Sequence, residues 1–447
     1  MKHYAKDYPK LMPLGLAYIA AVLRGKHEIS VLDDNLEEPS NEQVAELIRK
    51  TGPDVIAYSA MSVLFERAVE IARLAKQAKP SVVNVIGGPH ANSLPEKVLE
   101  EQAFDYAVYG EGEITFAELL GKIERGESVE DVKGVVWRRG DSIMINPRRE
   151  LIQDLDSLPF PARDLFPIEK YERREISLGV YPIDNLNTSR GCPYRCKFCS
   201  AKAILGKGYR LRSAKNVVDE IDVMVREYGS KGIYFREDNF TASRKRVEEV
   251  CDELKRRNID VVWACESRVN SLDKELMRKM HDAGCRIVWV GAESGLQETL
   301  DRIQKDITLE QVRNVVKWGK EIGVMIGCSF IIGFPWEDKA MMDKTVDFAC
   351  ELDPDSAWFN IFWLMPVSEM YYEVMEAKQI DEELGSGVYT VKTGNFNREW
   401  MENYQHEAHK KFYSNPKRLM RTGFRKVRSG EISPVNAVKK LWNMFFK

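Results

Sequence analysis

The chain has 447 residues, of which 44% are hydrophobic and 30% are charged, and its formal net charge is −3. This length is enough for about two or three domains with large buried cores. No apolar run reaches the roughly 20 residues that a membrane-spanning helix needs, and the small net charge favours no class of partner by itself.

Residues 13–125 alternate between segments of helical periodicity and short segments rich in β-branched residues. The pattern predicts helices at 13–26, 41–51, 63–78 and 94–102, and strands at 27–34, 54–60, 82–88 and 106–112. Such alternation implies a parallel sheet with helices on both faces, and we assign it to a first domain at 1–133. The chain enters a helix almost at once, so we expect the first strand to be missing or the start to be incomplete.

The segment GVVWRRGDSIMINP at 134–147 predicts a hairpin, and the proline-rich stretch at 154–167 predicts a linker, which together fill 134–182. Further strands are predicted before a cysteine loop and at 232–238, 261–267, 288–294, 324–334 and 357–366. Six β/α units favour a partly open parallel barrel over 183–370, which binds ligands at the carboxyl ends of its strands. Residues 371–447 are expected to form a helical, basic extension. The predicted fold class is therefore α/β, with a doubly wound, Rossmann-like domain, a partial (β/α)6 barrel and this extension.

Three of the eight cysteines lie in SRGCPYRCKFCS, where Cys192, Cys196 and Cys199 have the spacing C-x3-C-x2-C. A structural zinc site, as in a zinc-stapled binding module, would need a fourth ligand, and no histidine lies nearby in sequence. Three thiolates suit a [4Fe–4S] cluster whose fourth iron is open to a substrate. The remaining cysteines lie in apolar patterns that predict core packing and a reducing cytoplasm: Cys251, Cys265, Cys285, Cys328 and Cys350.

The segment CPYRCKFC resembles the signature of the radical S-adenosylmethionine enzymes. In that family the open iron chelates S-adenosylmethionine, and one electron cleaves it to a 5′-deoxyadenosyl radical that abstracts a hydrogen atom. The resemblance implies anaerobic chemistry, a one-electron reductant such as a flavodoxin or ferredoxin, and cofactor contacts from five strand-end or loop residues. These are Phe198 and Gly333 near the adenine, Asp238 in an acidic motif, Glu293 near the ribose and amino group, and Arg268 as a carboxylate clamp.

The segments MPLGLAYIAAVL, YSAMS and VIGGPHANSLPE, followed by YAVYGEGE, resemble the cobalamin-binding domain of one subclass of that family. Strand ends and glycine loops there would admit a cofactor tail, which marks Ser59, Met61, Gly87, Gly88 and Gly110 as candidate cobalamin-binding residues. The family motif D-x-H-x-x-G reads KLMPLG here, which keeps Gly15 but places Met12 at the histidine position. We therefore expect cobalamin without a histidine lower ligand; the alternative is a relic scaffold that binds no cobalamin.

These features predict a radical enzyme that uses methylcobalamin to methylate an unactivated carbon of a small-molecule or lipid-like substrate. One alternative is radical cyclisation, rearrangement or carbon–carbon coupling on a tetrapyrrole or lipid. A methylthiotransferase is disfavoured because no cysteine precedes Cys192 to hold a second cluster.

The C-terminal residues 415–447 carry nine Lys/Arg and one Glu, a net charge of +8, and end in an apolar segment. Such a basic amphipathic end favours either peripheral membrane contact or a helix that caps the barrel. A nucleic-acid partner is not expected, because no aromatic-rich RNA-binding pattern is visible.

Overall fold

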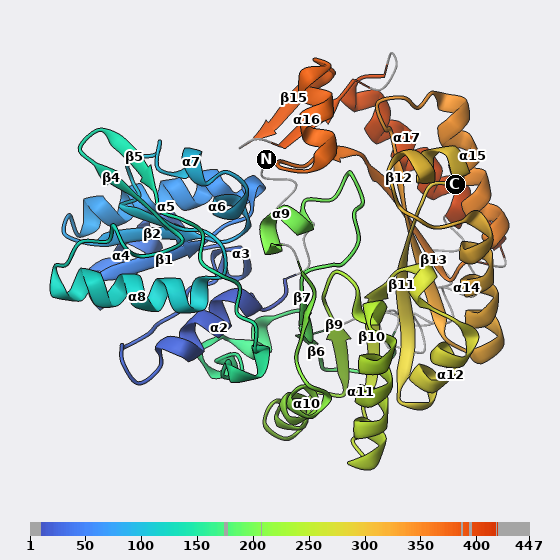
Figure 1. Cartoon of the computed structure of the whole chain (residues 1–447), viewed down its shortest axis with the longest axis horizontal. Helices are drawn as coiled ribbons and strands as arrows, with labels where there is room; N and C mark the ends of the chain where they lie inside the picture. The colour runs from blue at the N-terminus through green and yellow to red at the C-terminus, as the bar shows by residue number, and fades with distance from the viewer. Residues whose placement is uncertain are drawn as a thin grey trace.

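The computed structural model describes residues 10–173, 178–206, 208–385, 388–392, 396–416 and 418. Figure 1 shows two bodies side by side, an N-terminal one in blue and cyan and a second one in green to orange, with α9 (Ala201–Leu205) between them. Within the described residues, no helix combines the length and apolar character that crossing a bilayer requires. The predicted amphipathic end lies outside them: Leu441, Trp442, Met444, Phe445 and Phe446.

The N-terminal domain is a five-stranded sheet in the order β1-β2-β3-β4-β5 with helices on both faces. Its strands are β1 (Val55–Ser59), β2 (Val83–Gly87), β3 (Tyr106–Val108), β4 (Val135–Arg139) and β5 (Ser142–Ile145), and its main helices are α2 (Leu14–Leu23), α4 (Asn41–Thr51), α5 (Phe65–Ala78), α6 (Pro89–Ser93), α7 (Pro95–Val98) and α8 (Gly112–Arg125). Neighbouring strand residues face opposite layers: Val85 packs with α8, whereas Ile86 packs with α5. The predicted doubly wound architecture is confirmed.

The antiparallel pair β4–β5 joins this sheet beside β3, so the sheet continues past the boundary that we expected at residue 133. The strand predicted at 27–34 is wrong, because the described chain is irregular there until the short helix α3 (Asp34–Glu37). Its apolar residues pack in three different directions: Ile29, Val31 and Leu32 each join a separate hydrophobic cluster. Alternating apolar residues therefore did not define one buried face.

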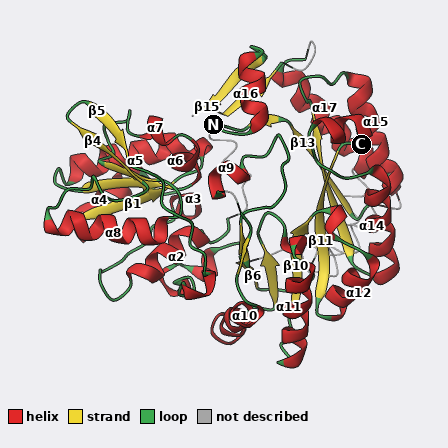
Figure 2. Cartoon of the chain, viewed as in Figure 1, coloured by secondary structure: helices red, strands yellow, loops and turns green. Residues whose placement is uncertain are grey.

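The second domain is built on six parallel strands in the order β13-β12-β11-β10-β9-β6. They are β6 (Ile183–Leu186), β9 (Gly232–Phe235), β10 (Val262–Ser267), β11 (Cys285–Glu293), β12 (Met325–Ile332) and β13 (Ser356–Ile361). The principal helices between them are α10 (Ala214–Tyr228), α11 (Arg244–Arg256), α12 (Lys274–Asp282), α14 (Leu309–Ile322) and α15 (Lys339–Leu352), and they lie on the outer side of the strands (Figure 2). The edge strands β6 and β13 do not pair, so the predicted partial barrel is confirmed.

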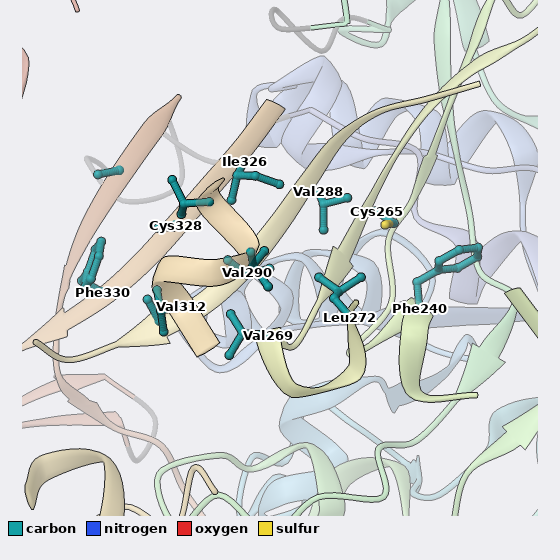
Figure 3. Close-up of a cluster of buried hydrophobic side chains, with 14 of the residues drawn as sticks. Phe240, Cys265, Val269, Leu272, Val288, Val290, Val312, Ile326, Cys328 and Phe330 are labelled. Atoms are coloured by element: carbon teal, nitrogen blue, oxygen red, sulfur yellow. The ribbon is translucent and has the colours of Figure 1, made fainter. Parts of the chain in front are cut away.

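The core between these strands and helices includes the scattered cysteines. Figure 3 shows Cys265 and Cys328 among valine, isoleucine and phenylalanine side chains. Cys251 and Cys285 are also fully buried, and Cys350 is half-buried at the edge of the same core. Their predicted role as small apolar core residues is confirmed.

The segment after residue 370 is only partly helical, which corrects the prediction. Between α16 (Glu369–Glu376) and α17 (Arg398–Tyr413) lie β15 (Ile380–Gly385) and β16 (Val388–Val391), which form a small sheet with β14 (Trp363–Leu364). The β16 sequence VYTV is β-branched and aromatic, a composition that favours a strand. Helix α17 packs on the edge strand β13, where Phe412 meets Phe359.

A buried carboxylate, Glu220 of α10, joins three separate segments of the chain. Arg163, from the proline-rich segment, donates to Glu220 Oε1 at 2.7 Å, and Arg212 Nη1 lies 2.6 Å from Oε2. Arg212 also donates to the hydroxyl of Tyr18 on α2 at 3.2 Å. The network therefore holds the first helix of the N-terminal domain against the barrel.

We expect Glu220→Gln to destabilise the chain by about 3–5 kcal/mol, because it leaves two buried guanidinium groups without a counter-charge. Thermal unfolding of the variant should show a clearly lower midpoint than the wild type. The matched control is Glu227→Gln, which removes the same charge from an exposed position on the same helix. Equal midpoints for the two variants would contradict this role of Glu220.

Candidate functional site

A cavity of about 520 Å³ lies between the two domains, at the carboxyl ends of their strands. Its N-terminal wall contains five of the residues marked in the sequence: Gly15, Ser59, Gly87, Gly88 and Gly110. Asp238, just past β9, lines the opposite wall together with Gly191, which directly precedes Cys192. Of the cobalamin candidates, only Met61 does not line the cavity.

Geometry requires glycine at one of these positions and leaves open space at another. Gly88 has φ +89°, and a Cβ there would lie 2.7 Å from Ser59 Oγ and 3.0 Å from the Ala60 nitrogen. A Cβ at Gly15 would meet no atom within 4 Å, so a side chain there would project into the cavity instead. The missing side chains therefore form a cradle that a bound group can approach closely, which fits a cofactor tail.

No histidine among the described residues lines this cavity. Met12, at the position of the family histidine, is 5% exposed and packs with Phe166 and Tyr171 away from the cavity. His90 is also buried, with its Nδ1 3.0 Å from Ser62 Oγ, and burial lowers the pKa of His90 to about 4. The cradle therefore fits a cobalamin that receives no histidine from this wall.

The three clustered cysteines lie on the loop between β7 (Ser189–Arg190) and α9. The backbone turns tightly there, with the Cys199 nitrogen donating to the Cys196 carbonyl at 3.1 Å. Partial burial raises the pKa of Cys192, and the charges of Asp238 and Cys196 contribute in the same direction. Metal binding to these thiols would release their protons.

Among the described residues, no three His, Cys, Asp or Glu side chains converge on a position for a single metal ion. The donor chemistry of the loop, three thiols of which one residue is exposed and two are half-buried, suits an iron–sulfur cluster.

Lys305 lies at the centre of the side chains predicted to contact S-adenosylmethionine. Its Nζ is 2.5 Å from Glu293 and 5.9 Å from the ring centre of Phe198, and its carbonyl accepts from Arg268. Phe198 in turn meets Phe334, the neighbour of Gly333, edge to face at 6.5 Å. The structure thus brings Phe198, Arg268, Glu293 and the loop of Gly333, which lie far apart in sequence, close to Lys305. Lys305 itself was missed, because nothing in RIQKDIT distinguishes it from a surface lysine.

Sequence reasoning also missed a buried ion network between the domains. Glu111 accepts from Arg190 at 2.8 Å and from Arg210 at 2.9 Å, and Glu113 pairs with Arg190 at 2.5 Å. Burial acts to raise the pKa of Glu111, but the hydrogen bond from Arg190 and further contacts hold it below its usual value. The carboxylate is therefore ionised and ties the glycine loop after β3 to the residue that precedes Gly191.

The guanidinium of Arg268 is occupied by protein groups. Nη1 donates to Cys196 Sγ at 2.9 Å, Nη2 donates to the Lys305 carbonyl, and Nε donates to Asn270 at 3.3 Å. The group also stacks on the ring of Tyr194, 3.8 Å from its centre. Arg268 therefore donates to Cys196, a predicted cluster ligand. The predicted role of Arg268 as a clamp for the carboxylate of S-adenosylmethionine stays a prediction.

We expect Arg268→Gln to lower the reduction potential of the reconstituted cluster by about 60 mV, a tenfold change in the ratio of reduced to oxidised form. A cationic donor to a ligand sulfur stabilises the added electron, and the variant lacks it. Electron paramagnetic resonance at fixed poise measures this ratio, and Arg268→Lys, which keeps the charge, should shift it less. An unchanged potential together with weaker S-adenosylmethionine binding would restore the carboxylate clamp.

Glu337 fixes the loop that carries Gly333 and Phe334. Its Oε2 accepts from the backbone nitrogens of these two residues at 2.9 and 3.1 Å, and its buried Oε1 has no hydrogen-bond partner among the described residues. Burial raises the pKa of Glu337 to about 7, although the two backbone N–H groups act in the opposite direction. At neutral pH the carboxyl group is therefore partly protonated in the folded chain and ionised in the unfolded one.

The raised pKa of Glu337 predicts a pH-dependent stability. The stabilisation is complete below about pH 4.5, where the unfolded group is also protonated, and it is lost as the pH rises through about 7. Because Glu337→Gln stays neutral, the wild type should lose up to about 3 kcal/mol relative to it between pH 5 and 8. Thermal midpoints of both proteins across this range measure the gap, and parallel curves would refute the raised pKa.

Two family models match the chain: the B12 binding domain over residues 4–120 and the Radical SAM superfamily over residues 186–349. An uncharacterized methyltransferase of Pyrococcus horikoshii is 34% identical over 418 residues, which are 92% of this chain and 90% of that relative. An anaerobic magnesium-protoporphyrin IX monomethyl ester cyclase of Rubrivivax gelatinosus is 29% identical over 82% of this chain and 67% of its own length.

Two solved structures share the fold. The radical S-adenosylmethionine methyltransferase TsrM from Kitasatospora setae, with cobalamin and a [4Fe–4S] cluster bound, has a TM-score of 0.70 at 20% identity, over 83% of this chain and 73% of its own. The cobalamin-dependent S-adenosylmethionine radical enzyme OxsB has a TM-score of 0.75 at 17% identity, over 99% of this chain and 73% of its own. At these identities the likeness establishes the architecture of both domains.

Proposed function

Because the chain belongs to the cobalamin-dependent radical S-adenosylmethionine enzymes, we propose that it transfers a methyl group to an unactivated carbon atom of its substrate. The cofactors of the family are a [4Fe–4S] cluster, S-adenosylmethionine and cobalamin. When bound, the cluster supplies an electron that cleaves S-adenosylmethionine, and cobalamin supplies the methyl group. The P. horikoshii relative, itself named a methyltransferase, supports this reading.

One observation carries the proposal: the glycine cradle of the first domain lines the same cavity as Gly191, which directly precedes the cysteine loop of the second. Radical transfer requires the reacting carbon to lie near both the hydrogen-abstracting group and the methyl donor. We assign Cys192, Cys196 and Cys199 to the cluster. We further assign Phe198, Glu293 and the Gly333 loop to S-adenosylmethionine.

The cobalamin assignment rests on the cradle of Gly15, Ser59, Gly87, Gly88 and Gly110. We propose that the cobalt takes no histidine lower ligand, because Met12 is packed in the core and His90 is held by Ser62. The chain's contribution at this wall is then to bind and orient the cofactor through backbone close approach. We keep Asp238, which lines the opposite wall of the cavity, as a candidate contact of S-adenosylmethionine.

Radical oxidative cyclisation is the second candidate. The specific observation for it is the similarity to the magnesium-protoporphyrin IX monomethyl ester cyclase. Both candidates share the cluster and S-adenosylmethionine, so they differ only in the fate of the substrate radical after hydrogen abstraction.

The remaining partners belong to the same proposal. Cleavage of S-adenosylmethionine needs a one-electron reductant, for which we propose a flavodoxin or ferredoxin. We also propose a cytoplasmic location, with peripheral membrane contact through residues that lie outside the described part of the chain.

Counting products separates the two candidates. Methylation should yield one S-adenosylhomocysteine and one 5′-deoxyadenosine for each methylated product, whereas cyclisation should yield 5′-deoxyadenosine without S-adenosylhomocysteine. Cys196→Ala should abolish both products and lower the iron content, because the cluster loses a ligand. The matched control, Cys350→Ala, removes a half-buried thiol outside the loop and should retain full iron and turnover. Undiminished activity of Cys196→Ala would contradict the assignment.

A further inference from the structure

The two walls of the interdomain cavity differ in chemical character. The wall of the first domain is formed by glycine backbone, apolar side chains and the two carboxylates Glu111 and Glu113, which are paired with Arg190, whereas the barrel wall carries a larger set of charged side chains. The charged set is Arg190, Arg212, Arg236, Glu237, Asp238 and Glu266. A ligand that fills this cavity therefore presents its polar side to the barrel.

Most of these charges are already satisfied by protein groups. Glu237 is buried and accepts from Thr188 at 2.6 Å and from Ser189. Arg190 and Arg212 are buried in the ion networks described above. These side chains build the wall, and they have little capacity left for a ligand.

Arg236 and Glu266 are different, although they lie next to each other. Their side chains are 36% and 41% exposed, and the nearest nitrogen–oxygen distance is 3.6 Å, which is longer than a hydrogen bond. The Tyr234 hydroxyl donates to Glu266 at 3.3 Å, and the Tyr234 ring lies under the guanidinium, 4.8 Å from its carbon. Stacking supports the flat face of Arg236 and leaves its N–H edges open, and its side chain donates no hydrogen bond to any described residue.

An aromatic residue is the strand neighbour of Glu266 in the barrel sheet. Trp289 is the register partner of Glu266 on β11 and of Gly327 on β12. A Cβ at Gly327 would overlap the Trp289 ring, so only glycine admits the indole at this level of the barrel. Trp289 packs with apolar residues of the barrel strands and does not line the cavity, whereas Arg236 and Glu266 do.

We propose that Arg236 and Glu266 bind the substrate, and that the substrate is a small polar molecule with a carboxylate or phosphate group and a neighbouring hydrogen-bond donor. A guanidinium binds such anions through paired N–H groups, and a carboxylate accepts from a hydroxyl or ammonium group. A hydrocarbon ring in the same place would bury the Arg236 guanidinium without a hydrogen-bond acceptor, which is unfavourable. The inference rests on the proposed function, since it names the substrate class of that site.

The test uses the full chain reconstituted with iron, sulfide and cobalamin in the absence of air. Three probes share a hydroxyl and differ at the other end: 4-hydroxybutanoate, its uncharged amide 4-hydroxybutanamide, and 3-hydroxypropyl phosphate. Ligand-observed nuclear magnetic resonance detects weak, saturable binding of molecules of this size. We expect at least one acid to bind and the amide not to, and the preferred acid distinguishes a carboxylate from a phosphate substrate.

Substitutions at Arg236 and Glu266 show which side chain binds the acid probes. Arg236→Gln should weaken acid binding at least about tenfold, whereas Glu266→Gln, which keeps an acceptor and removes a like charge, should not weaken it. Arg226→Gln is the matched control, because it removes an exposed guanidinium from α10. Equal binding of amide and acid, acid binding by Arg236→Gln at wild-type strength, or equal losses in both cavity variants would overturn the proposal.

The same samples separate this proposal from the proposed function. Iron, cobalt and 5′-deoxyadenosine are measured for the wild type and for each variant. Acid binding without any methylated product would remove the proposed function and leave the substrate class standing. Full cofactor content and 5′-deoxyadenosine formation without acid binding would remove the substrate class alone.

Discussion

The carboxylate of Glu111 couples the two halves of the candidate site, and the rest of the geometry depends on it. It follows Gly110 in the first domain, and it binds Arg190 and Arg210 of the second at 2.8 and 2.9 Å. Arg190 leads directly into the loop that carries Cys192. Because an unpaired buried charge costs several kcal/mol, separating the domains here is strongly unfavourable. The glycine cradle and the cysteine loop are thus held at a fixed distance.

Buried charge is used differently at each level of the site. Between the domains it is fully paired, and Glu220 holds α2 and the barrel together in the same way. Around the cysteine loop, Lys305 forms an ion pair with Glu293, and the backbone carbonyl of Lys305 accepts a hydrogen bond from Arg268. In the cavity, the looser pair Arg236 and Glu266 stays partly exposed. The buried ion pairs hold the cavity walls in position, whereas the partly exposed pair Arg236 and Glu266 can bind a charged ligand.

Secondary structure was predictable wherever the apolar residues of a segment recur with a single period and pack together on one buried face. The six barrel strands and the parallel strands of the first domain follow such patterns. The prediction failed at 27–34, where Ile29, Val31 and Leu32 enter three different clusters, and it missed the strands at 380–391. In both places tertiary packing decided whether a strand formed, because β-propensity depends on what a side chain packs against.

The sequence by itself determined the α/β class, the cysteine loop and the glycine-rich strand ends, because spacing and residue type are local properties. Only the tertiary structure showed that Lys305 joins the predicted S-adenosylmethionine residues, that Arg268 donates to Cys196, and that Arg236 is partly exposed and 3.6 Å from Glu266. Charged residues look alike in a sequence. Their partners come from distant segments, and the role of a charge is fixed by which partner reaches it.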